Sequence, residues 1–170
     1  MIDDQINLEM KVKNLMRELR ESDWRVREEA ATALIRMGEQ VIEYLLPALK
    51  KAYLEIEEED STSRTGYQRS PTEIPFSTVL RNMNRIYYWK ITEVLVKIGE
   101  PVIVPIIKFL INETLPEVVI ETCFRLLNRL SPSKEQLVPI EPLLTSVILT
   151  GKRSSLLSEA KNLLTILSSR

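Results

Sequence analysis

The segment GEQVIEYLLPAL at residues 38–49 returns as GEPVIVPIIKFL at residues 99–110. The two segments carry Gly, Glu, Val, Ile and the final Leu at the same positions, 61 residues apart. Each is preceded by a stretch whose apolar residues recur with the roughly 3.6-residue period of an α-helix. The repetition predicts that the chain is assembled from copies of one helical unit.

The first copy is predicted to be a helical hairpin. Its first helix is expected from about Trp24 to Met37, where the apolar stripe runs. Asp23 precedes it and can cap the helix, because its carboxylate accepts from the unpaired amides of the first turn. Gly38 follows and suits the left-handed conformation that ends many helices. A second, apolar helix is expected from residue 41 to about residue 53.

Two further copies follow from shifts in the numbering. Adding 61 gives a hairpin in which Asn84 replaces the capping Asp23 and a second helix covers residues 102 to about 111. A further shift of 32 gives a weaker third copy, in which Ser131 takes the place of the glycine. Its second helix is expected over residues 136–149. The prolines in these second helices are expected to start or kink them.

The predicted fold is all-α, in a single domain over residues 1–170. Amphipathic segments at residues 8–19 and 156–167 flank the hairpins as cap helices, and no segment alternates at period two for long enough to predict a strand. Stacked hairpins bury their faces only against neighbours and terminal caps. We therefore expect a short α-solenoid, or superhelix, of about three hairpins. Residues 56–76, which are poor in apolar side chains, are expected to be a loop inserted between the first two units.

The first unit carries a recognisable set of residues ahead of its apolar second helix: Asp23, Val26, Arg27, Ala30, Ala33, Leu34, Met37 and Gly38. This set resembles the short HEAT-like repeat of phycobilisome-lyase-type proteins, which have armadillo-like helical folds. The resemblance covers residues 20–49 best, residues 84–110 less well and residues 116–149 weakly. It implies that Asp23 and Arg27 form a structural ladder between adjacent repeats.

The composition lacks the parts of most familiar catalytic sites. There is no histidine, which removes Ser-His and Cys-His pairs and histidine-bound metals. The four glycines are isolated, so no glycine-rich phosphate-binding turn can be drawn. Cys123, the only cysteine, falls on an apolar stripe and is expected to be a core thiol. We expect no enzymatic activity, no metal and no cofactor.

Charge and hydropathy predict a cytoplasmic protein. The 23 basic residues nearly balance the 24 acidic ones, so there is no overall attraction to anionic membranes or nucleic acids. The richest apolar run, residues 101–111, contains two prolines and Lys108, which predicts no membrane span. The N-terminal segment has two aspartates where a secretory signal would carry positive charge.

A solenoid offers a long surface and little preorganised chemistry, so the sequence favours a non-catalytic scaffold or adaptor that binds a partner protein. Contact residues are predicted on the second helices, in the inserted loop and on the aromatic triplet of residues 87–89. They are Glu43, Tyr44, Lys50, Lys51, Arg64, Arg69, Tyr88, Trp89 and Lys108.

The aromatic triplet cannot face one core, because consecutive helical residues point about 100° apart. Tyr87 takes the buried stripe position, which leaves Tyr88 and Trp89 at the margins or exposed. They would form a hot spot for a protein partner, or a surface on which nucleic-acid bases stack, unless the insertion covers them. An acidic stretch, residues 39–60, extends into the insertion, and a basic one, residues 61–90, covers the rest of the insertion and continues beyond it. These opposite charges either orient a partner or attract each other.

Two alternative functions remain open. Some members of the resembling family attach or detach bilin chromophores, usually with a second subunit, and others help to dismantle the antenna. The resemblance therefore implies, as a second hypothesis, a subunit of a bilin lyase or a phycobilisome assembly or degradation factor. Nucleic-acid binding ranks third, since we expect no basic position that recurs in every repeat. About three units are the minimum for a stable array, which also allows a homodimer through a terminal helix.

Overall fold

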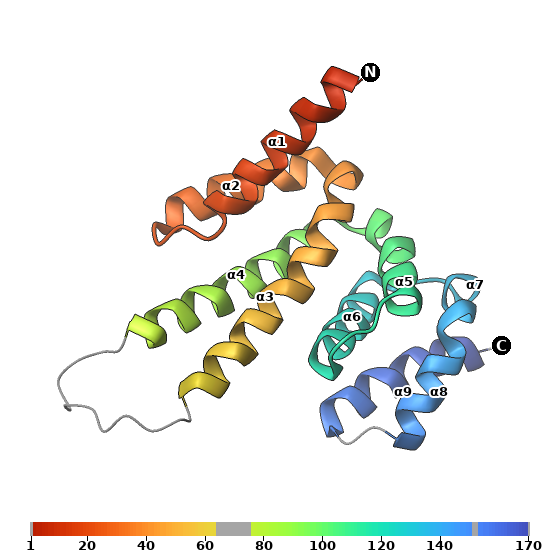
Figure 1. Ribbon diagram of the computed structural model, residues 1–170. Helices are drawn as coiled ribbons and strands as arrows, with labels where there is room; N and C mark the ends of the chain where they lie inside the picture. The colour runs from red at the N-terminus through yellow and green to blue at the C-terminus, as the bar shows by residue number, and fades with distance from the viewer. Residues whose placement is uncertain (1, 64–75, 151–152, 170) are drawn as a thin grey trace.

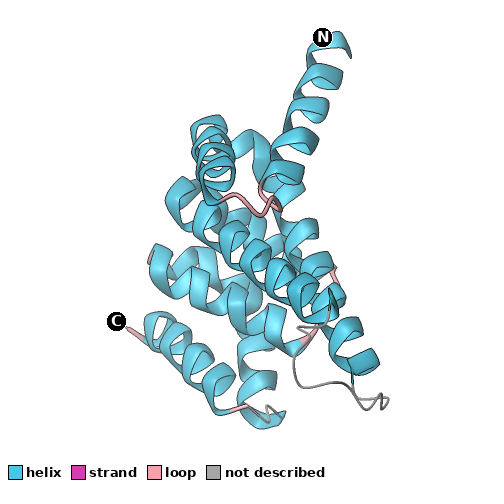
Figure 2. Ribbon diagram, turned by 90° about the vertical axis from the view of Figure 1, so that its left-hand side faces the viewer, coloured by secondary structure: helices cyan, strands magenta, loops and turns pink. Residues whose placement is uncertain are grey.

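Residues 2–63, 76–150 and 153–169 are described by a computed structural model, and all regular structure within these ranges is helical (Figures 1 and 2). No helix in these ranges is both long and apolar enough to cross a membrane. The α-helices are α1 (Ile2–Glu18), α2 (Trp24–Met37), α3 (Ile42–Ser63), α4 (Phe76–Ile98), α5 (Ile103–Asn112), α6 (Glu117–Leu130), α7 (Lys134–Leu137), α8 (Glu141–Thr150) and α9 (Ser154–Ser168). Three 3₁₀ turns precede α3, α5 and α8: η1 (Gly38–Val41), η2 (Glu100–Val102) and η3 (Val138–Ile140).

The prediction for the first helix is confirmed, since α2 runs from Trp24 to Met37. Asp23 caps it by accepting a hydrogen bond from the Arg25 amide at 2.8 Å. The Arg27 guanidinium donates to the backbone oxygens of Glu21 and Ser22 at 2.6 and 2.7 Å. Asp23 and Arg27 therefore fasten the turn between α1 and α2. Their hydrogen bonds within the described chain are local and do not link one hairpin to the next.

The three turns that the repeat aligns share a positive φ angle, although ψ is 61° at Ser131 and strongly negative at the two glycines. Gly38, Gly99 and Ser131 all have positive φ angles, of 61°, 87° and 52°. Ser131 is the only residue other than glycine with a positive φ in the described chain, a conformation that is uncommon for side-chain-bearing residues. This supports the shift of 32 that places Ser131 at the position of Gly99. The ψ angles of the two glycines, −130° and −144°, lie outside the left-handed helical region.

The predicted boundaries between the first two units were wrong. Helix α4 begins at Phe76, so Asn84 lies inside the helix and is not its N-cap. Helix α3 continues to Ser63, because Ile56 extends its buried stripe and glutamates, which are good helix formers, follow. Residues 56–63 of the predicted inserted loop are therefore helical. The rest of that loop, up to residue 75, lies outside the described residues.

The helices pack in two rows (Figure 1). In the first row, α2, α4, α6 and α9 each pack against the next, and α1 packs against α2. In the second row, α3 packs against α5, and α5 against α7 and η3, which lead into α8. Across the rows, α3 packs on α4, α5 on α6, and α8 on α9. From α2 onward, the order of the helices along the chain therefore alternates between the rows.

One apolar cluster fills the space between the rows, from Val12 of α1 to Leu167 of α9. Polar pairs join successive helices of the first row. Lys90 of α4 forms an ion pair with Glu28 of α2, and the Thr122 hydroxyl of α6 lies 2.6 Å from the Tyr88 hydroxyl of α4. Lys90 and Thr122 are 32 residues apart, so equivalent positions of the repeat reach back to the preceding helix.

Candidate protein-binding surface

Three consecutive aromatic residues of α4 lie in three different environments. Tyr87 is buried, and the Arg20 guanidinium stacks over its ring at 4.1 Å. Tyr88 is only 4% exposed and shares a hydrogen bond with Thr122 of α6. Trp89 is 52% exposed. The prediction of an accessible Trp89 is confirmed, whereas the prediction that Tyr88 stands at the margin or exposed was wrong.

The reason for this error is that α4 packs against three helices, α2, α3 and α6. A single apolar stripe accounts for the side that meets α3, and α6 covers a second side, where Tyr88 points. Burial raises the pKa of the Tyr88 phenol to about 12. The phenol is therefore neutral near neutral pH and serves the packing of α4 on α6.

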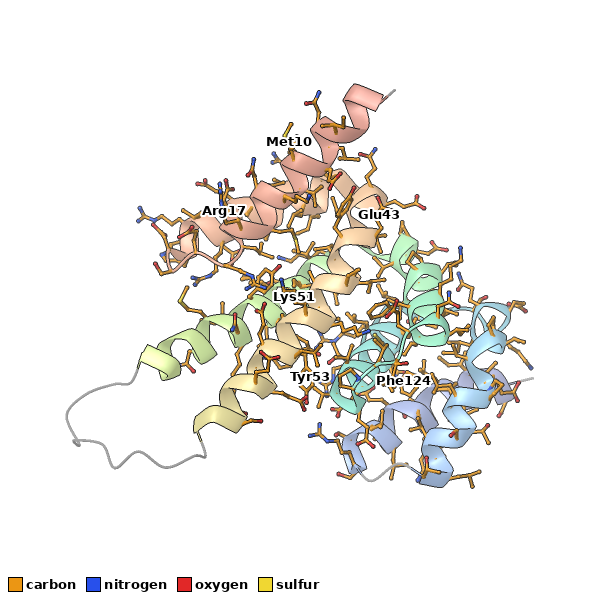
Figure 3. The ribbon with its side chains drawn as sticks, in the orientation of Figure 1. Met10, Arg17, Glu43, Lys51, Tyr53 and Phe124 are labelled. Carbon is orange, nitrogen blue, oxygen red and sulfur yellow. The ribbon has the colours of Figure 1, made fainter. Side chains whose placement is uncertain are left out.

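The first hollow, here called the Tyr53 groove, has a volume of about 750 Å³ and opens between the α3–α4 hairpin and the start of α6. Its lining is Tyr53, Ile56, Glu57, Asp60, Ser61, Arg85, Tyr88, Trp89, Val118 and Arg153. The Tyr53 hydroxyl donates to the Glu57 carboxylate at 2.6 Å, and Figure 3 labels Tyr53 on α3. The Arg85 guanidinium lies 3.8 Å from the Asp60 carboxylate, measured between Nη2 and Oδ2. The groove is therefore aromatic at its walls and carries both signs of charge.

The second hollow, here called the Arg129 groove, has a volume of about 490 Å³ and follows the line of contact between α4 and α6. Its lining is Trp89, Thr92, Glu93, Val96, Lys97, Thr122, Arg125, Leu126 and Arg129. Trp89 belongs to both grooves, so its indole stands where the two hollows meet.

The charges of the Arg129 groove are mostly paired. Hydrogen bonds from Lys90 and Lys97, at 2.8 and 2.7 Å, hold the pKa of Glu93 below its ordinary value. Arg125 donates to Glu121 at 2.6 Å. Arg129 is exposed and has no hydrogen bond or ion pair with another described residue. The unpaired charge of this groove is therefore positive.

A third hollow of about 230 Å³ lies between α3 and α5 and is lined by Pro47, Lys50, Lys51, Leu54, Phe109 and Glu113. Lys50 pairs with Glu113 across it at 2.8 Å, and Lys51 is exposed. Two of the predicted contact residues thus lie at a hollow of the second row. Glu43, Tyr44 and Lys108 line none of the three hollows. The predicted residues Arg64 and Arg69 lie outside the described residues.

A basic position recurs in all three units, contrary to the expectation from the sequence. Arg36, Lys97 and Arg129 are separated by 61 and 32 residues, the two shifts of the repeat. All three are exposed and lie in the last turns of α2, α4 and α6. A comparison of apolar positions between the units does not reveal these three basic residues. They become visible when charged positions are aligned with the same two shifts.

Cys123 has the properties of a core residue. It is fully buried, and burial raises the pKa of its thiol to about 12, so the reactive thiolate does not form near neutral pH. The described residues contain no group of three or more Cys, Asp or Glu side chains arranged to hold a metal ion. Cys123 lines none of the three hollows.

A comparison with protein-family models gave no match, and comparisons with curated proteins and with solved structures gave no significant match either. The HEAT-like identity of the repeat stays a prediction from the sequence.

Proposed function

We propose that the chain is a non-catalytic protein-binding module, built as a short α-solenoid, that contacts its partner along the α4–α6 contact. The solenoid is supported by the alternation of helices between two rows and by the positive φ angles at three equivalent turns. It is further supported by the links that Lys90 and Thr122 make to the preceding helix.

The observation that carries the binding function is the position of Trp89. Its side chain is 52% exposed at the meeting point of two hollows. Tryptophan is among the residues that contribute most to protein interfaces, especially where a surrounding pocket excludes water. Paired charges around both grooves would form the polar rim of such an interface.

This location differs from the second-helix surface that the sequence favours. The hollow at Lys50 and Lys51 is smaller, and Lys50 is already paired with Glu113. The two grooves that share Trp89 are larger, at about 750 and 490 Å³. The second row is therefore a secondary contact region in this proposal.

The bilin hypothesis receives less support from the Tyr53 groove. Arg85 and Arg153 could pair with the two carboxylates of an open-chain tetrapyrrole. However, Glu57 and Asp60 line the same groove and would repel those carboxylates. The mixed charge fits a peptide better than a small dianion.

Replacement of Trp89 by alanine tests the proposal, with Trp24 as a matched control. Trp24 is 62% exposed at the start of α2 and lines none of the three hollows. A phage-displayed library of random short peptides is selected on the immobilised wild-type protein. We expect the enriched peptides to bind Trp89→Ala at least about tenfold more weakly, equivalent to 1.4 kcal/mol or more, and Trp24→Ala as well as wild type. Equal binding to both variants, or no enrichment, would contradict the proposed function.

A further inference from the structure

The Arg129 groove combines an apolar floor with cations at one end. Trp89 lies toward the start of the groove, Val96 and Leu126 form apolar walls, and Lys97 and Arg129 lie at the end. Helices α4 and α6 run in the same direction here, because Tyr88 contacts Thr122 near the start of the groove and later residues of both helices, up to Lys97 and Arg129, line the rest of it. The groove therefore has a direction, from the indole to the two cations.

The two cations at this end differ in their local partners, since Lys97 is paired with Glu93 at 2.7 Å and Arg129 has no acidic partner among the described residues. Glu93 already accepts from Lys90 as well as from Lys97, and Arg125 is bound to Glu121. Arg129 has no partner among the described side chains, and neither has Arg36 at the equivalent position of α2. The ends of α2 and α4 lie close together, since η1 packs against η2. Arg36 thus extends the row of exposed basic residues from the groove toward α2, where Glu39 and Glu100 are also exposed on η1 and η2.

The helix dipole offers a purely structural explanation for these cations. Basic residues in the last turn of a helix interact favourably with the negative end of its dipole. That effect acts within each helix and is satisfied by any basic residue near the C-terminus. It does not require that Lys97 and Arg129 border an open apolar groove with an exposed tryptophan at its other end. The combination indicates a surface that is complementary to a ligand.

We infer that the partner segment bound along the α4–α6 contact is acidic, with one large apolar side chain packed on Trp89 and carboxylates paired with Lys97 and Arg129. This inference rests on the proposed function and names the chemistry of the partner. A long acidic segment reaches Arg36 as well. Such complementary charge orients a partner and speeds its association.

A protein segment fits this surface better than a nucleic acid. Glu57 and Asp60 line the Tyr53 groove at the far side of Trp89, where a continuous polyanion would be repelled. The basic row has three members, fewer than the roughly six to ten phosphate contacts that strong nucleic-acid binding uses. A peptide can place acidic residues in the Arg129 groove and neutral or basic residues in the Tyr53 groove.

The peptides selected on the wild-type protein provide the first test. We expect them to be enriched in Asp and Glu beside a large apolar residue, relative to the unselected library. Peptides that need Trp89 but are neutral or basic would overturn the inference and leave the proposed function standing. Absence of any Trp89-dependent peptide would overturn both. The two failures are therefore distinguishable.

The second test removes the cations. In Lys97→Ala/Arg129→Ala, Glu93 keeps its hydrogen bond from Lys90, so the fold is preserved; circular dichroism and thermal unfolding verify this. The control is Lys11→Ala/Lys161→Ala, which removes the same charge from two exposed lysines that line none of the three hollows. Fluorescence anisotropy with a labelled selected peptide is expected to show about tenfold weaker binding for the first variant, the size expected for two exposed ion pairs. Binding by the control is expected to stay within about twofold of wild type.

Added salt is expected to weaken peptide binding by the wild-type protein, because it screens the ion pairs. The difference in affinity between wild type and Lys97→Ala/Arg129→Ala should therefore become smaller. Equal affinity of that variant and the Lys11→Ala/Lys161→Ala control would overturn the inference. So would Lys97- and Arg129-dependent binding of a labelled single-stranded oligonucleotide that displaces the peptide, because it would identify the basic edge as a nucleic-acid surface.

Discussion

At the scale of single residues, three adjacent aromatic side chains of α4 make three different kinds of contact. Tyr87 holds the contact of α4 with Arg20, Tyr88 joins α4 to α6, and Trp89 faces the grooves. The division follows from the 100° between consecutive residues and from the number of neighbours that surround α4. Residue 89 can therefore serve binding while its two predecessors stabilise the fold.

The role of Tyr88 predicts a loss of stability in Tyr88→Phe. The substitution removes a buried hydroxyl that lies 2.6 Å from Thr122, and we expect a cost of about 1 kcal/mol in the free energy of unfolding. Tyr53→Phe is the matched control, because its hydroxyl binds Glu57 one turn away in an exposed pair and should cost less than about 0.5 kcal/mol. Urea unfolding of both variants measures the difference. Equal losses would show that the contact with Thr122 adds nothing to the packing.

At the scale of elements, the units are separated by turns that need positive φ angles. Gly99 meets this need without strain, because a side chain would be the only obstacle and glycine has none. Ser131 adopts the same sign of φ with a side chain present, which costs about 1 kcal/mol or more. The third turn is therefore strained relative to the first two.

Exchange of residues at these turns is expected to give effects of opposite sign. Ser131→Gly should raise the free energy of unfolding by roughly 1 kcal/mol, and Gly99→Ala should lower it by at least as much. A new methyl group at residue 99 would meet no atom within 4 Å, so its cost comes from the backbone and not from a clash. Thermal unfolding compares the two variants. A destabilised Ser131→Gly would mean that the serine side chain makes an interaction that outweighs its strain.

The same elements explain how far the sequence could predict the structure. The bounds of α2 were predictable because Asp23 and Gly38 are strong end signals. Helix α4 lacks such a signal at Asn84, and the preceding residues continue the helix back to Phe76. The grooves could not be predicted, because their size depends on how α4 and α6 diverge. The recurring cations could have been found, since they require only the alignment of charged positions.

At the scale of the whole molecule, the two rows give each helix mainly neighbours that are close in the chain. Helix α9 packs chiefly on α6, α7 and α8, while α1 packs on α2 and α2 on α4. For the proposed solenoid we expect the stability to be close to a sum of local units and their interfaces, so that the two ends open separately. The Arg129 groove lies between these ends, on α4 and α6, whereas the Tyr53 groove also includes Arg153 at the start of α9.

Local opening predicts a regional response to core substitutions. Leu163 of α9 and Leu34 of α2 are both fully buried, and truncation of either to alanine should cost about 2–5 kcal/mol. We expect Leu163→Ala to raise amide hydrogen exchange in α8 and α9 and to leave α2 and α3 protected. Leu34→Ala, its matched control, should do the reverse, and mass spectrometry of peptic fragments measures both. Equal loss of protection along the chain in both variants would show one cooperative unit, and the solenoid would then be the wrong description of its energetics.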